Sequence, residues 1–227
     1  MADQLTFDLP VRPALGRGDF FVSPANAVAV AQVEGWGDWP QGKLVLCGPA
    51  GSGKTHLAHV WAALSGARIA SVQDLSEAAL PRLAAAPLVV EDAQRVAGDP
   101  ALERSLFHLH NMALAAGSAL LLTARDAPSR WGIALPDLRS RMEGTNVTRL
   151  DAPDDALLSA VLVKQFADRQ IDIDPRVIQF LAPRIERDFE RLGALVSALD
   201  RAALARQSPI TVPLARAVLD SLDRGAE

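Results

Sequence analysis

Residues 43–57 read KLVLCGPAGSGKTHL, and this stretch decides the fold. A short apolar run leads directly into the motif G-x-x-x-x-G-K-[ST], with glycines at Gly48 and Gly53, and a helical sequence begins at Lys54 and Thr55. In such a phosphate-binding loop (P-loop), the glycines let backbone N–H groups face the phosphates, and the start of the next helix adds a positive dipole end. The stretch therefore predicts a strand, a P-loop and a helix in that order, with a nucleotide bound at the loop.

Two residues of the P-loop have side-chain tasks of their own. Lys54 is expected to reach the β and γ phosphate oxygens, and the Thr55 hydroxyl is expected to ligate Mg²⁺. A chance glycine-rich turn is the alternative, and the strand before the motif and the helix after it argue against that alternative. The residues expected to contact ADP or ATP here are Gly48, Pro49, Ala50, Gly51, Ser52, Gly53, Lys54, Thr55 and His56.

Two acidic residues end another apolar run, PLVVED, at residues 87–92. A P-loop protein needs acidic groups on a neighbouring strand to hold the water shell of the metal and to orient the attacking water. We expect Glu91 to be the metal-side residue, together with Thr55, and Asp92 to be the water-side residue. An ordinary acidic strand end is the alternative.

Apolar runs and helical patterns alternate through the first two thirds of the chain. Apolar strands that alternate with helices are typical of a parallel sheet with helices on both faces, the α/β class. The expected strands are residues 43–47, 68–72, 87–91, 119–124 and 146–150, and the expected helices between them are 54–65, 74–85, 100–116 and 136–143.

Strand patterns stop at Asp151. Apolar residues then recur at helical spacing, and Pro175 and Pro213 stand where new helices would begin. We therefore expect a small all-helical second domain. The predicted division is an N-terminal arm at residues 1–18, an αβα domain at 19–150 and a helical domain at 151–227.

The composition excludes several classes of protein. With 227 residues, 49% hydrophobic content and a net charge of −4, the chain is large enough to bury a full core, and no run of lysine and arginine favours strong direct DNA binding. Its longest apolar stretch, Met112–Ala124, falls short of the roughly 18 residues that a membrane span needs. There is one cysteine and no signal-peptide pattern, so we expect a cytoplasmic protein without an intramolecular disulfide.

Six segments resemble, in order and spacing, the AAA+ module of the bacterial replication initiator DnaA. The resemblance is closer still to the DnaA-homologous Hda family, because the chain ends where DnaA would continue into its helix-turn-helix DNA-binding domain. It implies an AAA+ P-loop NTPase with a parallel five-stranded αβα core and a small all-helical lid domain. The segments are DFFVSPAN (19–26), GPAGSGKTHL (48–57), VVEDAQRVAGD (89–99), LLLTARDAPSRW (120–131), LPDLRSRMEG (135–144) and RDFERLGALVSALDRA (187–202).

The resemblance assigns two groups of residues to the nucleotide. Phe21, Val22 and Asn26 would line the adenine side. Thr123, at the end of the run ALLLTA, would be sensor 1, the polar group that senses the γ phosphate. Taken alone, a threonine at a strand end more often serves as a cap or turn residue.

The resemblance also assigns two arginines. Arg141 matches the arginine finger, which points across a subunit interface at the γ phosphate of a neighbour and is here the expected catalytic residue in trans. Arg187 matches sensor 2, which reaches from the lid to the nucleotide, and Arg191, about one turn further on, is an alternative for that role. Read from the residues alone, an arginine at a helix end is usually a solvated charge.

The function implied by the resemblance is regulation of replication initiation. A protein of this kind holds ADP or ATP with Mg²⁺, docks on the DNA polymerase sliding clamp and promotes hydrolysis of the ATP bound to DnaA. We expect slow intrinsic ATP hydrolysis, because Glu91 adds a methylene where the family has aspartate and Mg²⁺ demands near-ideal geometry. The alternatives are an AAA+ ATPase that acts directly on DNA or loads a helicase, and a P-loop phosphotransferase; a homo-oligomer is compatible with each.

The N-terminal stretch QLTFDLP is the last candidate site. Its alternating apolar residues are typical of a half-buried edge strand or packing arm, but proline and glycine follow at once. In the Hda family a short N-terminal peptide with a leading glutamine binds the sliding clamp. The resemblance therefore implies a clamp-binding peptide within residues 4–10, formed by Gln4, Leu5, Phe7 and Leu9.

The sequence alone does not settle the roles of the tryptophans and the histidines. Trp36 and Trp39 are predicted to cover either the sheet edge or the nucleotide base. The histidines include a pair at helical spacing, and packing or surface positions are favoured for them over a zinc site.

Overall fold

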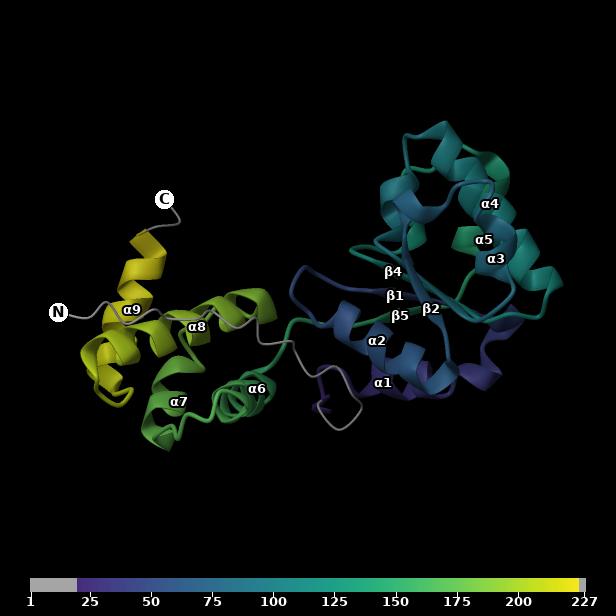
Figure 1. Cartoon of the computed structure of the whole chain (residues 1–227). Helices are drawn as coiled ribbons and strands as arrows, with labels where there is room; N and C mark the ends of the chain where they lie inside the picture. Colours follow the sequence, from purple (N-terminus) through teal and green to yellow (C-terminus); the bar gives the residue numbers. More distant parts are fainter. Residues whose placement is uncertain (1–19, 225–227) are drawn as a thin grey trace.

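A five-stranded parallel sheet forms the centre of the larger domain (Figure 1). The computed structural model describes residues 20–224. The strand order is β2-β3-β4-β1-β5, which places β4 between β3 and the P-loop strand β1. The predicted parallel α/β core is therefore confirmed. The strands are β1 (Lys43–Cys47), β2 (Arg68–Ser71), β3 (Leu88–Glu91), β4 (Leu120–Ala124) and β5 (Val147–Arg149).

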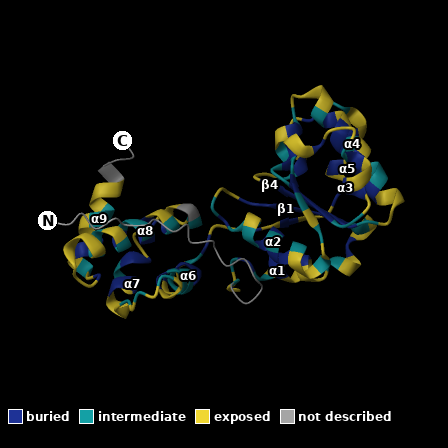
Figure 2. Cartoon of the chain, viewed as in Figure 1, coloured by how far each residue is buried: buried dark blue, intermediate teal, exposed yellow. Residues whose placement is uncertain are grey.

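Helices cover both faces of this sheet. On one face α1 (Ala27–Glu34) and α2 (Lys54–Ser65) pack on the inward side chains of the central strands, such as Leu46. On the other face lie α3 (Leu80–Ala84), α4 (Pro100–Ala115) and α5 (Pro136–Glu143). Side chains alternate between the faces along each strand, and the middle strands β3, β4 and β1 are mostly apolar because both of their faces are buried (Figure 2).

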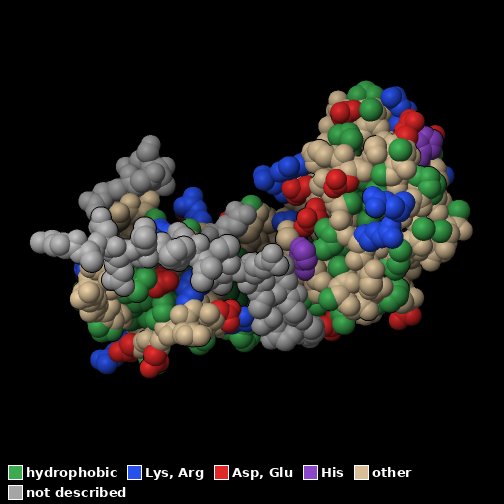
Figure 3. All heavy atoms as spheres, in the orientation of Figure 1, with side chains coloured by type: hydrophobic (Ala, Val, Ile, Leu, Met, Phe, Trp, Pro, Cys, Tyr) green, Lys and Arg blue, Asp and Glu red, His purple; other side chains and the backbone are tan. Residues whose placement is uncertain are grey.

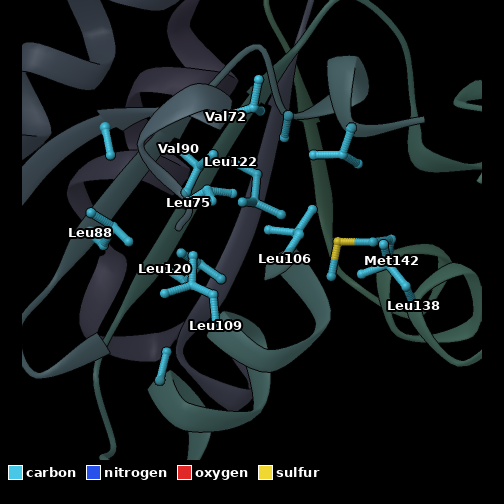
Figure 4. Close-up of a cluster of buried hydrophobic side chains, with 14 of the residues drawn as sticks. Val72, Leu75, Leu88, Val90, Leu106, Leu109, Leu120, Leu122, Leu138 and Met142 are labelled. Carbon is cyan, nitrogen blue, oxygen red and sulfur yellow. The ribbon is translucent and has the colours of Figure 1, made fainter. Parts of the chain in front are cut away.

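The core on the second face fixes α5 against α4. Leu138 and Met142 of α5 are fully buried and point toward Leu106 of α4 (Figure 4). Burying a leucine or methionine side chain stabilises a fold by about 1.5–3 kcal/mol. These two side chains therefore hold α5 in place, while the residues between them stay exposed.

One predicted helix is much shorter than expected. The sequence predicts a helix over residues 74–85, but Val72–Asp74 form a single 3₁₀ turn and α3 begins only at Leu80. The reason is local hydrogen bonding: the carboxylate of Asp74 accepts the backbone N–H of Ser71 at 2.7 Å and closes that turn. The predicted pattern also gave no helix for residues 27–34, where α1 lies.

Four helices with their own core follow the sheet. They are α6 (Asp155–Asp168), α7 (Pro175–Leu181), α8 (Phe189–Arg206) and α9 (Val212–Arg224). Side chains from all four, among them Leu162 and Val196, form a separate hydrophobic cluster. Asp154 and Asp174 cap α6 and α7 through backbone N–H groups, and Pro175 takes the first helical position as predicted. The expected helical lid domain is present.

The two tryptophans that the sequence left open belong to the core. The ring of Trp39 stacks on that of Trp61 with centroids 5.2 Å apart, and Trp36 meets Trp61 edge to face at 6.3 Å. The indole N–H of Trp39 donates to the carbonyl of Gln32 at 2.7 Å. These rings therefore cover the side of the sheet on which α1 and α2 pack.

Charged side chains of both signs lie on the surface of the protein. On the face shown in Figure 3, acidic and basic side chains are interspersed without a broad region of either sign. Between residues 20 and 224, none of the helices combines the length and apolar character that crossing a membrane requires.

Candidate nucleotide-binding site

The P-loop lies between β1 and α2, as the sequence predicts. Gly51 and Gly53 have backbone φ angles of 63° and 93°, the left-handed region that glycine adopts without strain. The side chain of Ser52 is buried, and its hydroxyl has no hydrogen-bond partner among the described residues. A concave backbone at a helix N-terminus with an unsatisfied hydroxyl fits a phosphate group.

Lys54 and Thr55 are the first two residues of α2, directly after the P-loop glycine Gly53. The ammonium of Lys54 donates to the carbonyl of Pro49 at 2.6 Å. Burial lowers the pKa of Lys54 below its ordinary value, the nearby Asp92 opposes this effect and Arg125 adds to it. Thr55 is exposed, so its hydroxyl is accessible to a solvated metal ion.

The acidic strand end lies beside the sensor candidate. Thr123 is buried in β4, and its hydroxyl accepts the backbone N–H of Asp92 at 3.1 Å. Asp92 has a φ of 52°, so the chain turns sharply as it leaves Glu91 at the end of β3. The structure thus brings together Asp92 and Thr123, which the sequence placed on separate strands.

The carboxylate of Asp92 has partners of its own. It forms an ion pair with Arg95 at 3.3 Å and accepts a hydrogen bond from the side chain of Gln94 at 3.3 Å. Arg95 is more than half exposed, so the pair contributes little to stability. These contacts orient the carboxylate of Asp92, the residue predicted for the water side, toward its own turn.

The predicted adenine-side residues divide into two kinds. Asn26 is buried, donates to the carbonyl of Phe21 at 2.9 Å and accepts the N–H of Ser23 at 2.8 Å. It therefore shapes the turn before α1. Phe21 and Val22 are 40% and 50% exposed and offer apolar surface to a base. His56, next to Thr55, meets the ring of Phe20 edge to face at 5.0 Å.

The arginine-finger candidate lies on α5, a helix that is held in place by its two buried side chains. Arg141 is exposed, and its guanidinium lies 5.5 Å from the ring centroid of Phe107 on α4. Its backbone carbonyl accepts the hydroxyl of Thr145 at 2.8 Å and the ammonium of Lys43 at 3.4 Å. The backbone of Arg141 is therefore fixed while its charge faces solvent.

Lys43 and His110 form a buried pair that the sequence analysis missed. The ammonium of Lys43 lies 2.9 Å from Nε2 of His110, and both residues are at most 5% exposed. Burial lowers the pKa of each, and the charge of Arg141 lowers the pKa of Lys43 further. A neutral His110 that accepts from Lys43 agrees with these shifts. A lysine at a strand start gives no sequence signal for this contact.

Glu103 of α4 is a second buried group without a sequence signal. It is 2% exposed, and its carboxylate accepts backbone N–H groups from Gly98, Ala134 and Leu135 at 3.2, 3.1 and 2.7 Å. Burial alone would raise the pKa of Glu103, but these N–H groups outweigh it and hold the pKa below its ordinary value. Since Leu135 directly precedes α5, Glu103 anchors the start of the helix that carries Arg141.

Replacing Glu103 by glutamine is therefore expected to destabilise the protein. The amide keeps the shape of the side chain but loses the charge and turns one acceptor into a donor, so we expect a loss of about 2 kcal/mol in the free energy of unfolding at pH 7. The lowered pKa means that this contribution is present above the ordinary pKa of glutamate and is lost as pH falls through the folded-state value. Urea unfolding at pH 7, with the exposed Glu143→Gln as control, measures the effect; equal midpoints for wild type and Glu103→Gln would contradict it.

The side chains of both sensor 2 candidates form ion pairs with other residues of the lid domain. Arg187 forms an ion pair with Asp155 at 2.9 Å and lies 3.4 Å from the carbonyl of Pro153. Arg191 pairs with Glu186 at 2.8 Å. Arg187 precedes α8 and Arg191 lies in its first turn. The choice between them for sensor 2 stays a prediction.

Other predicted sites have different outcomes. The clamp-binding residues Gln4, Leu5, Phe7 and Leu9 lie outside the described residues. Within the described part of the chain, no group of three or more histidine, cysteine or acidic side chains could hold a metal ion. A nucleotide-bound Mg²⁺ does not require such a group, since Thr55 and Glu91 would share it with phosphates and water.

Comparisons with known proteins bear on the family and the fold of this chain. A family model described as "Hda, lid domain" matches residues 154–219. An uncharacterised protein of Haemophilus influenzae is 32% identical over 193 residues, which cover 81% of this chain and 84% of that protein. The fold is similar to domain III of the Thermotoga maritima replication initiation protein DnaA, with a TM-score of 0.79, 19% identity and coverage of 94% of this chain and 98% of that one.

Two other solved structures share the fold. AMPPCP-bound DnaA from Aquifex aeolicus matches with a TM-score of 0.68 and 17% identity over 84% of this chain and 66% of that one. The Thermotoga maritima RuvB Holliday junction branch migration motor matches with a TM-score of 0.70 and 16% identity over 93% of this chain and 73% of that one. These likenesses show that the chain shares its fold, a parallel sheet domain followed by a helical domain, with both proteins.

Proposed function

Because this chain belongs to the Hda family of DnaA-related AAA+ proteins, we propose that it regulates replication initiation by promoting hydrolysis of the ATP bound to DnaA. The observation that carries the proposal is the position of Arg141. Its carbonyl contacts Lys43 at the start of β1, whereas the P-loop follows the end of that strand. The two ends of a five-residue strand lie roughly 13 Å apart. Such a placement favours an arginine that acts on the nucleotide of a partner.

The nucleotide of this chain has a different role in the proposal. The backbone of Gly51, Gly53 and Lys54 and the hydroxyl of Ser52 would hold its phosphates, and Thr55 and Glu91 would share Mg²⁺. AMPPCP binds the DnaA of Aquifex aeolicus, which has the same fold. We propose ADP or ATP as the ligand, bound between the αβα domain at residues 19–150 and the lid at 151–227. The bound nucleotide would supply a charged phosphate chain, which the P-loop residues of the αβα domain would hold.

Intrinsic hydrolysis is expected to be weak. Glu91 carries a longer side chain than aspartate at the metal side, and Mg²⁺ tolerates little deviation from octahedral geometry. At the water side, the carboxylate of Asp92 is engaged by Arg95 and Gln94. Both features support a nucleotide that persists while the protein acts on its partner.

Catalysis in trans requires a positive charge beside the γ phosphate of the partner's ATP. When an arginine approaches a γ phosphate, its guanidinium offsets the negative charge that develops in the transition state, which is worth about 10³ to 10⁵ in rate. Arg141 is exposed, and its helix is held by Leu138, Met142 and the anchor at Glu103. A positioned backbone with an exposed guanidinium is the arrangement that this role needs.

The proposal includes the sliding clamp as the second partner. A peptide with glutamine first and alternating apolar residues fits a groove that takes alternate side chains in pockets. The experiment that tests this part compares the full chain with a version that lacks residues 1–10, measuring clamp binding and hydrolysis of DnaA-bound ATP together. We expect the shortened chain to lose both; clamp binding that persists would remove the peptide from the mechanism.

A further inference from the structure

The turn that begins α8 rests directly on the P-loop. The backbone N–H of Phe189 donates to the carbonyl of Gly51 at 3.0 Å. A Cβ atom added at Gly51 would lie 2.1 Å from Oδ1 and 2.5 Å from Oδ2 of Asp188. A Cβ atom added at Gly53 would lie 3.3 Å from the ring of Phe189. The lid thus places a carboxylate against the loop whose backbone would hold the phosphates.

The lid helix fixes this carboxylate in place. Oδ1 of Asp188 accepts the N–H of Arg191 at 3.3 Å, and its backbone carbonyl accepts the N–H of Leu192 at 3.0 Å. Asp188 therefore caps α8 in the manner of an N-cap residue. The ring of Phe189 packs against the hydrophobic cluster of the lid. Because the cap and the ring both belong to the lid, the position of the charge is set by the position of that domain.

The charge of Asp188 acts on the same site as the phosphates. It is one of the charges that oppose the lowering of the pKa of Lys54, so the two groups interact through space. A carboxylate fixed against an anion site repels an anion that enters the site, and the repulsion grows with the charge of that anion.

We propose that Asp188 is a specificity-determining residue of the nucleotide site, which weakens the binding of a nucleoside triphosphate more than that of a nucleoside diphosphate. The inference rests on the proposed nucleotide-dependent function and adds a residue to it. A triphosphate brings about one more negative charge to the loop than a diphosphate. The arrangement in which Asp188 lies against Gly51 is therefore favoured with the diphosphate.

The substitution Asp188→Asn isolates the charge. Asparagine has nearly the same shape and is as good an N-cap as aspartate, so α8 keeps its start. We expect the affinity for ATP with Mg²⁺ to rise about tenfold and that for ADP with Mg²⁺ about threefold or less, so the ratio of the two dissociation constants shifts toward ATP. Isothermal titration calorimetry on the full chain measures both constants.

A matched control exists in the same domain. Asp174 caps α7 and accepts the N–H of Arg176 at 2.8 Å, and Asp174→Asn makes the same change in net charge away from the P-loop. That variant is expected to keep the wild-type ratio. Asp188→Ser, a second variant that keeps a capping side chain without the charge, is expected to shift the ratio as Asp188→Asn does.

The possible outcomes distinguish the role of Asp188 from the nucleotide-dependent function on which it rests. A wild-type protein that binds both nucleotides, with the same ratio of dissociation constants in Asp188→Asn and Asp188→Ser, would overturn the role of Asp188 alone. A wild-type protein that binds neither ADP nor ATP would overturn the nucleotide-dependent function itself. A ratio that shifts in both Asp188 variants and not in Asp174→Asn supports the inference.

Discussion

Replacing Lys54 by alanine is expected to lower the affinity for ADP and ATP by about 100-fold, which corresponds to about 2.7 kcal/mol. Lys54 is the positive side chain at the start of α2, beside the P-loop backbone. A hydrogen bond to a charged group contributes about 1.5–3 kcal/mol, and an ammonium beside two phosphates makes more than one such contact. Titration calorimetry with each nucleotide and Mg²⁺ measures the loss.

The chain offers a matched control for this variant. Lys164 lies on α6 in the lid and pairs with Asp168 at 2.7 Å, so Lys164→Ala removes the same side chain far from the P-loop in sequence. We expect it to retain the wild-type affinity. Equal affinities for wild type and Lys54→Ala would mean that the nucleotide does not use the P-loop.

Replacing Arg141 by alanine is expected to reduce the stimulated hydrolysis of DnaA-bound ATP by about 10³-fold. The reason is the loss of the guanidinium that would offset transition-state charge on the partner's γ phosphate. The fold should survive, because the side chain of Arg141 is exposed and its carbonyl still accepts Lys43 and Thr145. Losing the contact with Phe107 costs only about 0.5–1 kcal/mol. Single-turnover hydrolysis on DnaA, with the clamp loaded on DNA, measures the rate.

Arg139 provides the comparison on the same helix. It is also exposed and lies two residues before Arg141, which turns its side chain to a different side of α5. Arg139→Ala is expected to keep most of the stimulated rate. If Arg139→Ala and Arg141→Ala reduce the rate equally, a general loss of positive surface rather than an arginine finger would explain both.

The sequence was most informative where local rules decide the structure. The P-loop motif, the apolar strands around it and the proline at the start of α7 each predicted an element that the structure contains. Those predictions depend on near neighbours: backbone freedom at Gly53, and a helix start at Pro175. The helix predicted over 74–85 was too long for the same kind of reason: the side chain of Asp74 closes a turn with Ser71 that periodicity does not register, and α3 begins only at Leu80.

Contacts between distant residues could not be predicted in this way. Glu103 meets the backbone of Ala134 and Leu135, and Lys43 meets His110, pairs that are 31, 32 and 67 residues apart. The contact of Asp188 with Gly51 joins two domains. In each case a charged residue in an ordinary helix or strand pattern becomes specific only when the fold brings a second segment to it. The anchors of the site are therefore found in the structure, whereas its phosphate-binding loop is found in the sequence.

Hydrolysis of DnaA-bound ATP in the presence and absence of the wild-type chain tests the proposed function most directly. The assay would follow labelled ATP bound to DnaA, with ADP and the clamp loaded on DNA supplied in both arms. We predict that the wild-type chain raises the hydrolysis rate by about 10³-fold or more, the lower end of the range of about 10³ to 10⁵ open to an arginine supplied in trans. An unchanged rate, from a chain shown in the same preparation to bind nucleotide and clamp, would contradict the account.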